Sequence, residues 1–262
     1  MDLMKGKKGL IMGVANERSI AWGISQKLTE AGAELAFTYP ADALKKRVIP
    51  LAEKLNSKVT FSCDVEKKED VTKLFEDIKS QWGQIDFVVH AVAFSDKSEL
   101  SGEYLNTSRE NFLRSMLISC FSFTEVSKEA AKIMKEGGSL LTLTYESTKA
   151  IPNYNVMGVC KSALETSVKY LARDLGEKNI RVNAICPVLI KTDGLIKALN
   201  NKFSPAKKNV NKFFKEFSKQ NSALGSLPTP EHVASMCYYL SQIESSSITG
   251  QCINIDCGVF PQ

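Results

Sequence analysis

The amino-acid sequence predicts an α/β protein with a doubly wound parallel sheet. Strand-like and helix-like patterns alternate along the whole chain, which is typical of a parallel sheet with helices on both faces. Strands such as Phe87-Val88-Val89 are apolar throughout, as parallel strands covered on both sides are. The chain has 262 residues, of which 44% are hydrophobic, enough for one large domain and a substantial core. We therefore expect a single Rossmann-type domain over residues 1–262, built on a seven-stranded parallel sheet.

The expected strands are short apolar runs at residues 9–14, 34–39, 59–63, 85–90, 140–144, 180–185 and 252–255. The expected helices lie between them, at residues 19–31, 43–55, 69–82, 109–134, 154–175 and 231–240. Three of these helices are followed by glycine, at Gly32, Gly83 and Gly137. Glycine is the residue most often found just beyond a helix C-terminus. No linker or low-complexity tract interrupts the pattern, so no second domain is expected.

Residues 193–228 do not fit the alternation, and we interpret them as a helical lid over a substrate site. Ser204-Pro205 is a typical helix start, with serine as the N-cap and proline at the first position. Apolar residues follow at helical spacing, at Val210, Phe213, Phe214 and Phe217. Lysines occupy the opposite side, at Lys208, Lys212, Lys215 and Lys219. Two interpretations stay open: a surface helix with a solvated face, or a lid that covers an apolar chain and presents lysines to an acidic carrier.

Charge and cysteine content exclude several classes of protein. The net charge is +5, but residues 195–225 contain seven lysines and one glutamate, so the basicity belongs to one segment. That distribution argues against general nucleic-acid binding and favours a local acidic partner. The seven cysteines form no Cys-x-x-Cys pair, and the two histidines are far apart. We therefore expect free thiols in a cytoplasmic protein, with no metal site, disulfide framework or transmembrane segment.

The stretch from Leu140 to Lys161 carries the expected chemistry. Tyr154 and Lys161 are seven residues apart, so on one helix they lie within roughly 20° of one face. The lysine cation would favour the phenolate and make the phenol a better proton donor. A tyrosine and a lysine suit a reduction in which an oxygen gains negative charge as hydride arrives. This spacing is common by chance, and an exposed helix often carries both residues. The position of the pair after a strand late in the alternating α/β chain favours the functional interpretation.

The first strand–helix turn, Gly13 to Ile20, is the expected dinucleotide site. Gly13 allows close backbone approach, and the helix N-terminus at Ser19-Ile20 offers N–H groups to phosphate. The turn is not a G-x-G-x-x-G motif, and the alternative is a plain turn with Ser19 as an N-cap. Position 40, where an acid suits NADH and an arginine suits NADPH, is Pro40. The absence of arginine there favours NADH over NADPH.

Three later positions have two interpretations each. Asp64, after the third strand, is expected to meet the adenine amino group or to cap the next helix. The small residues around Val92 let a ligand lie on the backbone, but they also suit ordinary sheet packing. Thr192 is expected to bond the nicotinamide carboxamide or a phosphate, or only to cap a turn.

The chain resembles the bacterial enoyl-(acyl carrier protein) reductases, a divergent branch of the short-chain dehydrogenases and reductases. The most specific matching stretch is Pro152-Asn153-Tyr154-Asn155-Val156-Met157-Gly158 with Lys161. Further matches are Gly13 to Asn16, Ser19 to Gly23, Phe37 to Tyr39, Cys63 to Val65, His90 to Phe94, Leu141 to Tyr145 and Arg181 to Ile185.

This resemblance implies a reaction and a set of site residues. Tyr154 would hydrogen-bond the thioester carbonyl of a trans-2-enoyl chain, Lys161 would hold the nicotinamide ribose, and Tyr145 would line the acyl pocket. Ser95 is assigned to the substrate. The residues assigned to NADH are Gly13, Ser19, Ile20, Asp64, Val65, Val92, Lys161, Ile190 and Thr192. The implied partners are acyl carrier protein and three further copies of the chain in a homotetramer.

The chain departs from the family pattern on the substrate side. The family's Ser-Ala-Gly-Pro before Ile190 is Cys186-Pro187-Val188-Leu189 here, and the loop after Tyr145 also differs. Two alternatives to enoyl reduction therefore stay open. One is a ketone or 3-oxoacyl reductase of the same fold, because tyrosine and lysine serve that chemistry equally well. The other is a paralogue that binds dinucleotide without turnover.

Overall fold

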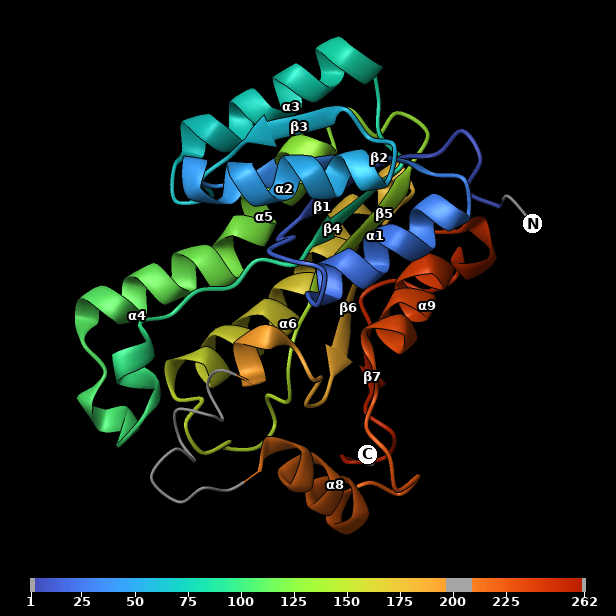
Figure 1. Cartoon of the computed structure of the whole chain (residues 1–262). Coiled ribbons are helices and arrows are strands. Elements are labelled where there is room, and N and C mark those ends of the chain that lie inside the picture. The colour runs from blue at the N-terminus through green and yellow to red at the C-terminus, as the bar shows by residue number, and fades with distance from the viewer. Residues whose placement is uncertain (1–2, 197–208, 261–262) are drawn as a thin grey trace.

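The computed structural model describes residues 3–196 and 209–260, and within them the expected strands form one sheet. The sheet is seven-stranded and parallel, in the order β3-β2-β1-β4-β5-β6-β7 (Figure 1). The strands are β1 (Lys8–Met12), β2 (Glu34–Tyr39), β3 (Val59–Ser62), β4 (Phe87–His90), β5 (Gly138–Leu143), β6 (Ile180–Pro187) and β7 (Cys252–Ile255). The order reverses between β1 and β4, which is the switch point where ligands bind in doubly wound sheets.

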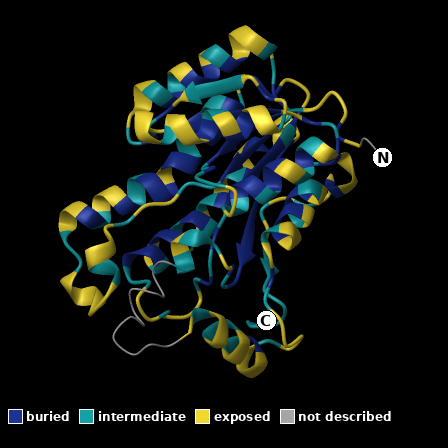
Figure 2. Cartoon of the chain, in the orientation of Figure 1, coloured by how far each residue is buried: buried dark blue, intermediate teal, exposed yellow. Residues whose placement is uncertain are grey.

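Helices cover both faces of the sheet and enclose two separate cores. One face carries α1 (Ile20–Glu30), α2 (Asp42–Lys54) and α9 (Pro230–Leu240). The other carries α3 (Lys68–Trp82), α5 (Ser122–Ala130) and α6 (Val156–Leu175). Figure 2 shows the buried strands between these layers.

Alternation along each strand divides its side chains between the two cores. On β1, Leu10 and Met12 enter one core and Ile11 enters the other, and all three are fully buried. Burial of each such side chain stabilises the fold by about 1.5–3 kcal/mol. The prediction of a two-sided parallel sheet is therefore confirmed at the level of single residues.

The predicted long helix at 109–134 is interrupted, and this is a correction. The structure has α4 (Arg109–Met116), then a π-helical turn η3 (Leu117–Phe121), then α5. A π turn inserts one residue into the helical repeat and is often found near functional sites. Hydrophobic periodicity does not reveal it because the chain keeps its helical direction through the turn.

The helix that carries Lys161 also begins later than predicted. Tyr154 lies in a turn, and α6 begins at Val156. The two preceding asparagines cause this, because Asn153 has φ 61° and Asn155 has φ 37°. Asparagine tolerates this left-handed region better than most residues, but a helix cannot pass through it.

Short helical turns fill connections that the sequence left without structure. They are η1 (Lys97–Leu100) and η2 (Tyr104–Asn106) before α4, η4 (Gly176–Lys178) after α6, and η6 (Ile243–Ser245) after α9. None of the described helices is both long and apolar enough to cross a membrane.

The described part of the expected lid contains α8 (Val210–Asn221), at the same end of the molecule as the C-terminus (Figure 1). Asn209 is its N-cap, and its side chain accepts hydrogen bonds from the backbone N–H groups of Asn211 and Lys212. The predicted start at Ser204-Pro205 and Lys208 lie outside the described residues. The segment after α8 is held by the C-terminal chain, since Ser222 donates its hydroxyl to the Cys257 carbonyl at 2.8 Å.

Candidate active site

The structure brings the predicted chemistry to the carboxyl edge of the sheet, where parallel strands end. Gly13 follows β1, Val92 follows β4, Tyr145 follows β5, and Ile190 follows β6. Gly13 and Val92 flank the switch point between β1 and β4, where a doubly wound sheet leaves room for a ligand, and Tyr145 and Ile190 follow the next two strands of the sheet.

Tyr145 and Tyr154 are in direct contact at this edge. Their ring centroids lie 5.0 Å apart and the ring planes are inclined by 59°, a tilted arrangement that aromatic pairs prefer. The turn that carries Tyr154 is fixed by Asn155, whose side-chain amide donates to the Glu99 carbonyl at 3.0 Å. The loop between residues 145 and 154 therefore brings the two tyrosines together.

Lys161 is buried on α6, below the end of β5. Its exposed fraction is 5%, and its ammonium Nζ donates to the Leu143 carbonyl at 2.8 Å. Burial lowers the pKa of Lys161 to about 8, so the group is mostly charged at neutral pH. An ammonium has three donors, and Leu143 is its hydrogen-bond acceptor among the described residues. Donors therefore remain for a bound ribose.

The expectation that Lys161 acidifies Tyr154 is wrong for this structure. The pKa of the Tyr154 phenol is raised well above its ordinary value, first by burial and then by Tyr145, Cys160, Cys186 and Glu165. Desolvation by burial disfavours the charged phenolate. Tyr154 is therefore a neutral hydrogen-bond donor at physiological pH.

The turn after β1 has the close approach that a dinucleotide site needs. Gly13 has φ +100°, and a Cβ atom there would lie 2.1 Å from the Ala91 carbonyl oxygen. Ser19 is the N-cap of α1, and its hydroxyl accepts from the Trp22 N–H. The alternative interpretation, a plain turn capped by Ser19, predicts the same hydrogen bond. The first N–H groups of α1, beginning at Ile20, have no partners within the helix and are suited to an anion.

The loop after β4 is fixed by side chains from α4 and η3. Ser119, on η3, accepts from the Phe94 N–H and donates to the Phe94 carbonyl, both at 2.9 Å. The side-chain amide oxygen Oδ1 of Asn111 accepts from the Ser95 hydroxyl at 3.3 Å and from the Asp96 N–H at 2.9 Å. The interruption of the long helix therefore positions the loop that carries Val92 and Ser95.

The remaining predicted cofactor residues lie along the same edge. Asp64 accepts from the Glu66 N–H at 3.1 Å, which is a local turn and not the helix cap that sequence reasoning considered. Val65 and Ile190 are buried in the two cores. Thr192 accepts from the Leu195 N–H at 3.3 Å, so it does cap a turn.

An ion pair joins the two loops that flank the expected cofactor. Arg18, in the turn after β1, contacts Asp193, just after β6, at 2.9 Å. Sequence reasoning did not identify this pair, because its partners lie in opposite halves of the chain.

Sequence reasoning also missed a group of three residues, two of which interact with Tyr154 and Lys161. Glu165, Cys186 and Cys252 have one ligand atom each, and these atoms lie within 4.8 Å of one another. They come from α6, β6 and β7, and no sequence spacing links them. Only the order of the last two strands in the sheet brings them together.

His90, the histidine nearest this edge, belongs to the core. It is fully buried, and its Nε2 atom lies 2.9 Å from the Ser122 hydroxyl. Burial lowers its pKa to about 3, so the ring is neutral. We therefore assign it no chemical role.

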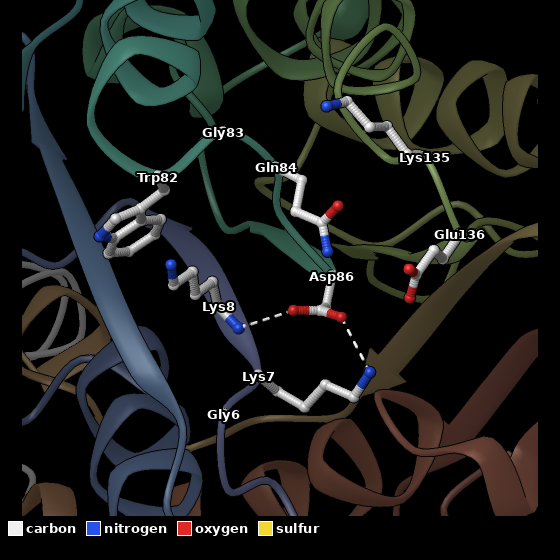
Figure 3. A pocket seen from close by; sticks show the side chains of 9 residues that line it. All are labelled: Gly6, Lys7, Lys8, Trp82, Gly83, Gln84, Asp86, Lys135 and Glu136. Atoms are coloured by element: carbon white, nitrogen blue, oxygen red, sulfur yellow. Dashed lines mark hydrogen bonds and ion pairs between the residues drawn. The ribbon is translucent and has the colours of Figure 1, made fainter.

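A separate cavity of about 400 Å³ opens at the opposite, amino-terminal edge of the sheet (Figure 3). Asp86 lies in it and accepts from the Lys7 ammonium at 2.9 Å and the Lys8 N–H at 2.8 Å. None of the predicted site residues lines this cavity. Its charged groups serve to join the start of β1 to the start of β4.

Comparisons with known proteins identify the family. The family model described as enoyl-(acyl carrier protein) reductase matches residues 13–260. An enoyl-(acyl carrier protein) reductase (NADH) of Rhizobium meliloti is 51% identical over 257 residues, covering 98% of this chain and 92% of that protein. One of Rickettsia typhi is 47% identical, covering 98% of this chain and 95% of that protein.

A solved structure supports the same family assignment. The crystal structure of the Anaplasma phagocytophilum enoyl-(acyl carrier protein) reductase in complex with NAD matches with a TM-score of 0.88 and 47% identity, covering 98% of this chain and 93% of that one. With the glycine turn, the Tyr145–Tyr154 pair and the buried Lys161 in place, the chain belongs to the enoyl-(acyl carrier protein) reductase family.

Proposed function

We propose that this protein catalyses the NADH-dependent reduction of the trans-2 double bond of enoyl thioesters carried by acyl carrier protein, a step of bacterial fatty-acid elongation. The observation that supports the proposal is the contact between Tyr145 and Tyr154 together with the buried Lys161 ammonium at the end of β5, at the same edge of the sheet as the glycine turn after β1. The family and the relatives named as NADH-dependent enzymes support it.

The residues that would hold NADH fit the group. Gly13 lets the backbone approach a pyrophosphate, and Ser19 and Ile20 present the start of α1 to it. Lys161 has ammonium donors for the nicotinamide ribose. We assign Asp64 and Val65 to the adenine, and Val92, Ile190 and Thr192 to the rest of the cofactor. When bound, NADH supplies the hydride that reaches the β-carbon.

Tyr154 and Lys161 then act on the thioester oxygen. As the β-carbon is reduced, negative charge develops on this oxygen as an enolate. The Tyr154 hydroxyl, kept protonated by its raised pKa, donates a hydrogen bond to that oxygen. The positive charge of Lys161 stabilises the same charge from the buried side. Tyr145 packs against Tyr154 and fixes its ring beside the acyl chain. The enolate then takes a proton from solvent at the α-carbon, which completes the reduction.

The lid helix α8 is proposed to contact acyl carrier protein. Phe213 packs on Phe214 and Phe217, with ring centroids 5.7 and 5.9 Å apart, and these rings are partly buried. The opposite side of α8 carries three exposed lysines, Lys212, Lys215 and Lys219. In this arrangement the aromatic side of α8 would face the acyl chain. The lysine side would face the acidic carrier protein.

Neutralising these lysines tests the carrier contact. We expect Lys212→Gln, Lys215→Gln and Lys219→Gln together to raise KM for a carrier-bound enoyl substrate about tenfold at low salt, because electrostatic steering is lost. KM for a small free thioester should not change. The matched control replaces three exposed lysines of α3, Lys68, Lys73 and Lys79, and should leave both values unchanged. Equal effects of the α8 variant on both substrates would contradict the proposal.

We also propose that the protein is a cytoplasmic homotetramer. Apolar side chains are exposed on adjacent helices of one sheet face: Leu113 on α4, Phe121 on η3, and Val159 and Tyr170 on α6. Exposed apolar side chains grouped on one face mark protein contacts, and a second copy of the chain would cover these.

The reaction is tested by following NADH oxidation with a crotonyl thioester and, in parallel, with an acetoacetyl thioester. We expect oxidation with the crotonyl substrate and none with the acetoacetyl substrate, and a lower rate when NADPH replaces NADH. Oxidation with the acetoacetyl substrate alone would instead identify a ketone reductase. Binding of NADH without turnover of either substrate, free or carrier-bound, would identify a non-catalytic paralogue.

A further inference from the structure

Three metal-ligating side chains converge beside the Tyr154–Lys161 pair. Glu165 lies on α6 about one turn after Lys161, Cys186 lies near the end of β6, and Cys252 begins β7. Two sulfur atoms and a carboxylate oxygen all lie within 4.8 Å of one another. Such a group is distinct from the tyrosines and the lysine that act on the thioester.

The carboxylate of this group is already oriented. Thr144 donates its hydroxyl to one oxygen of Glu165 at 2.7 Å, and Ser147 donates to the other at 2.8 Å. Each carboxylate oxygen accepts more than one bond, so both keep a lone pair for a ligand. Hydroxyl groups that fix a ligating side chain in this way raise the affinity of metal sites.

The two thiols can share an ion more readily than they can form a disulfide. Ala184 pairs with Cys252 and Cys186 pairs with Asn254, so the two cysteines are staggered by two residues on neighbouring strands. Strand spacing and rise then separate their Cα atoms by about 8 Å. A disulfide requires less than about 7 Å, whereas a shared ion lengthens the bridge between the sulfur atoms.

We propose that Glu165, Cys186 and Cys252 bind a thiophilic divalent cation, Zn²⁺, with a fourth position open to water. Bonds of about 2.3 Å to sulfur and 2.0–2.2 Å to oxygen place tetrahedral ligands about 3.5–3.8 Å apart. Closure of the cluster by about 1 Å at most, from its 4.8 Å limit, meets this geometry. The two sulfur ligands exclude Mg²⁺ and Ca²⁺, which take oxygen.

The exposure of Cys252 gives an ion access to the site, and the charge of the metal-bound cluster is balanced. Cys252 is exposed and Cys186 is buried, so an ion enters from solvent past Cys252. Binding converts two thiols to thiolates and releases two protons to solvent. Two thiolates, one carboxylate and Zn²⁺ carry one net negative charge, and the Lys161 ammonium, which interacts with both Glu165 and Cys186, balances it.

Loading leaves the net charge of the cluster unchanged. The free cluster carries one negative charge, on Glu165, beside two protonated thiols. The loaded cluster again carries one negative charge, because Zn²⁺ replaces the two protons. Binding of the ion does not rest on the proposed function.

The test of binding uses Cd²⁺, whose bonds to thiolates give an ultraviolet charge-transfer band. The reduced, metal-free full chain is titrated with Cd²⁺, alongside Cys252→Ser, Glu165→Gln and the matched control Cys257→Ser, a partly exposed thiol outside the cluster. We expect the band to saturate at one equivalent in the wild type and in Cys257→Ser. Cys252→Ser should lose about half of the band or more, and Glu165→Gln should bind about 10–100-fold more weakly. A full band in Cys252→Ser, or its loss in Cys257→Ser, would overturn the site.

A chain that gives the Cd²⁺ band yet oxidises no NADH with any thioester would refute the proposed function and leave the metal site standing.

Discussion

Lys161 keeps a positive charge in surroundings where burial disfavours it. Its pKa is lowered to about 8, with burial as the largest cause, and its ammonium is held by the Leu143 carbonyl. A modest rise in pH therefore removes a charge that the reaction uses.

We expect turnover to depend on pH through this lysine. Its active form is protonated, so kcat with a saturating crotonyl thioester should be nearly constant below pH 7. It should fall about tenfold per pH unit once the pH is well above the Lys161 pKa of about 8. A pH profile of kcat checks this at constant ionic strength. A rate that rises or stays level one pH unit above that value would contradict a role for the lysine charge.

Sequence reasoning selected Tyr154 and Lys161 as the candidate pair but did not predict the electrostatic surroundings of Tyr154. The seven-residue spacing suggested that the cation would acidify the phenol. The raised pKa of Tyr154 depends first on burial and then on Tyr145, Cys160, Cys186 and Glu165. The spacing of one tyrosine and one lysine contains no information on burial or on these neighbours.

At the scale of elements, the π turn η3 holds the loop after β4 in place. Ser119 makes two hydrogen bonds to the Phe94 backbone from this turn. Helical periodicity predicted a continuous helix, because apolar residues recur on both sides of the turn. The start of α6 was similarly misplaced by two residues, although the asparagines at 153 and 155 give a local signal for a turn.

Loss of the Ser119 hydroxyl should destabilise the protein. Ser119→Ala leaves the Phe94 N–H and carbonyl without that partner, which costs about 1–3 kcal/mol in the free energy of unfolding. Denaturation in urea measures this. The matched control is Ser127→Ala on α5, whose buried hydroxyl has no hydrogen-bond partner in the described part of the chain. That variant should be neutral or slightly stabilising, and equal losses in both variants would contradict the role of Ser119.

At the scale of the whole molecule, the alternation of strands and helices was sufficient to predict the fold. Two strands, at 34–39 and 252–255, have the predicted bounds, and the other strands differ by a few residues at one or both ends. Long-range contacts were not predictable in the same way. Glu165, Cys186 and Cys252 meet only because β7 lies beside β6 in the sheet, and Arg18 meets Asp193 only across the carboxyl edge.

Assembly is a property of the whole molecule that sedimentation can test. We expect Leu113→Glu combined with Phe121→Glu to convert a tetramer to smaller species, because two carboxylates would be buried in each contact. The control, Leu3→Glu, places the same charge on an exposed leucine before β1 and should remain tetrameric. A double variant that sediments like the wild type would show that this helical face is not the contact.

The central claim is that the Tyr154 hydroxyl stabilises the charge on the thioester oxygen. The most direct measurement compares kcat for a crotonyl thioester and NADH affinity between the wild type and Tyr154→Phe. Tyr239→Phe, on an exposed part of α9, is the matched control. Removal of one such donor should lower kcat about 10²–10³-fold and leave NADH affinity and the control unchanged. Wild-type turnover in Tyr154→Phe would contradict the account.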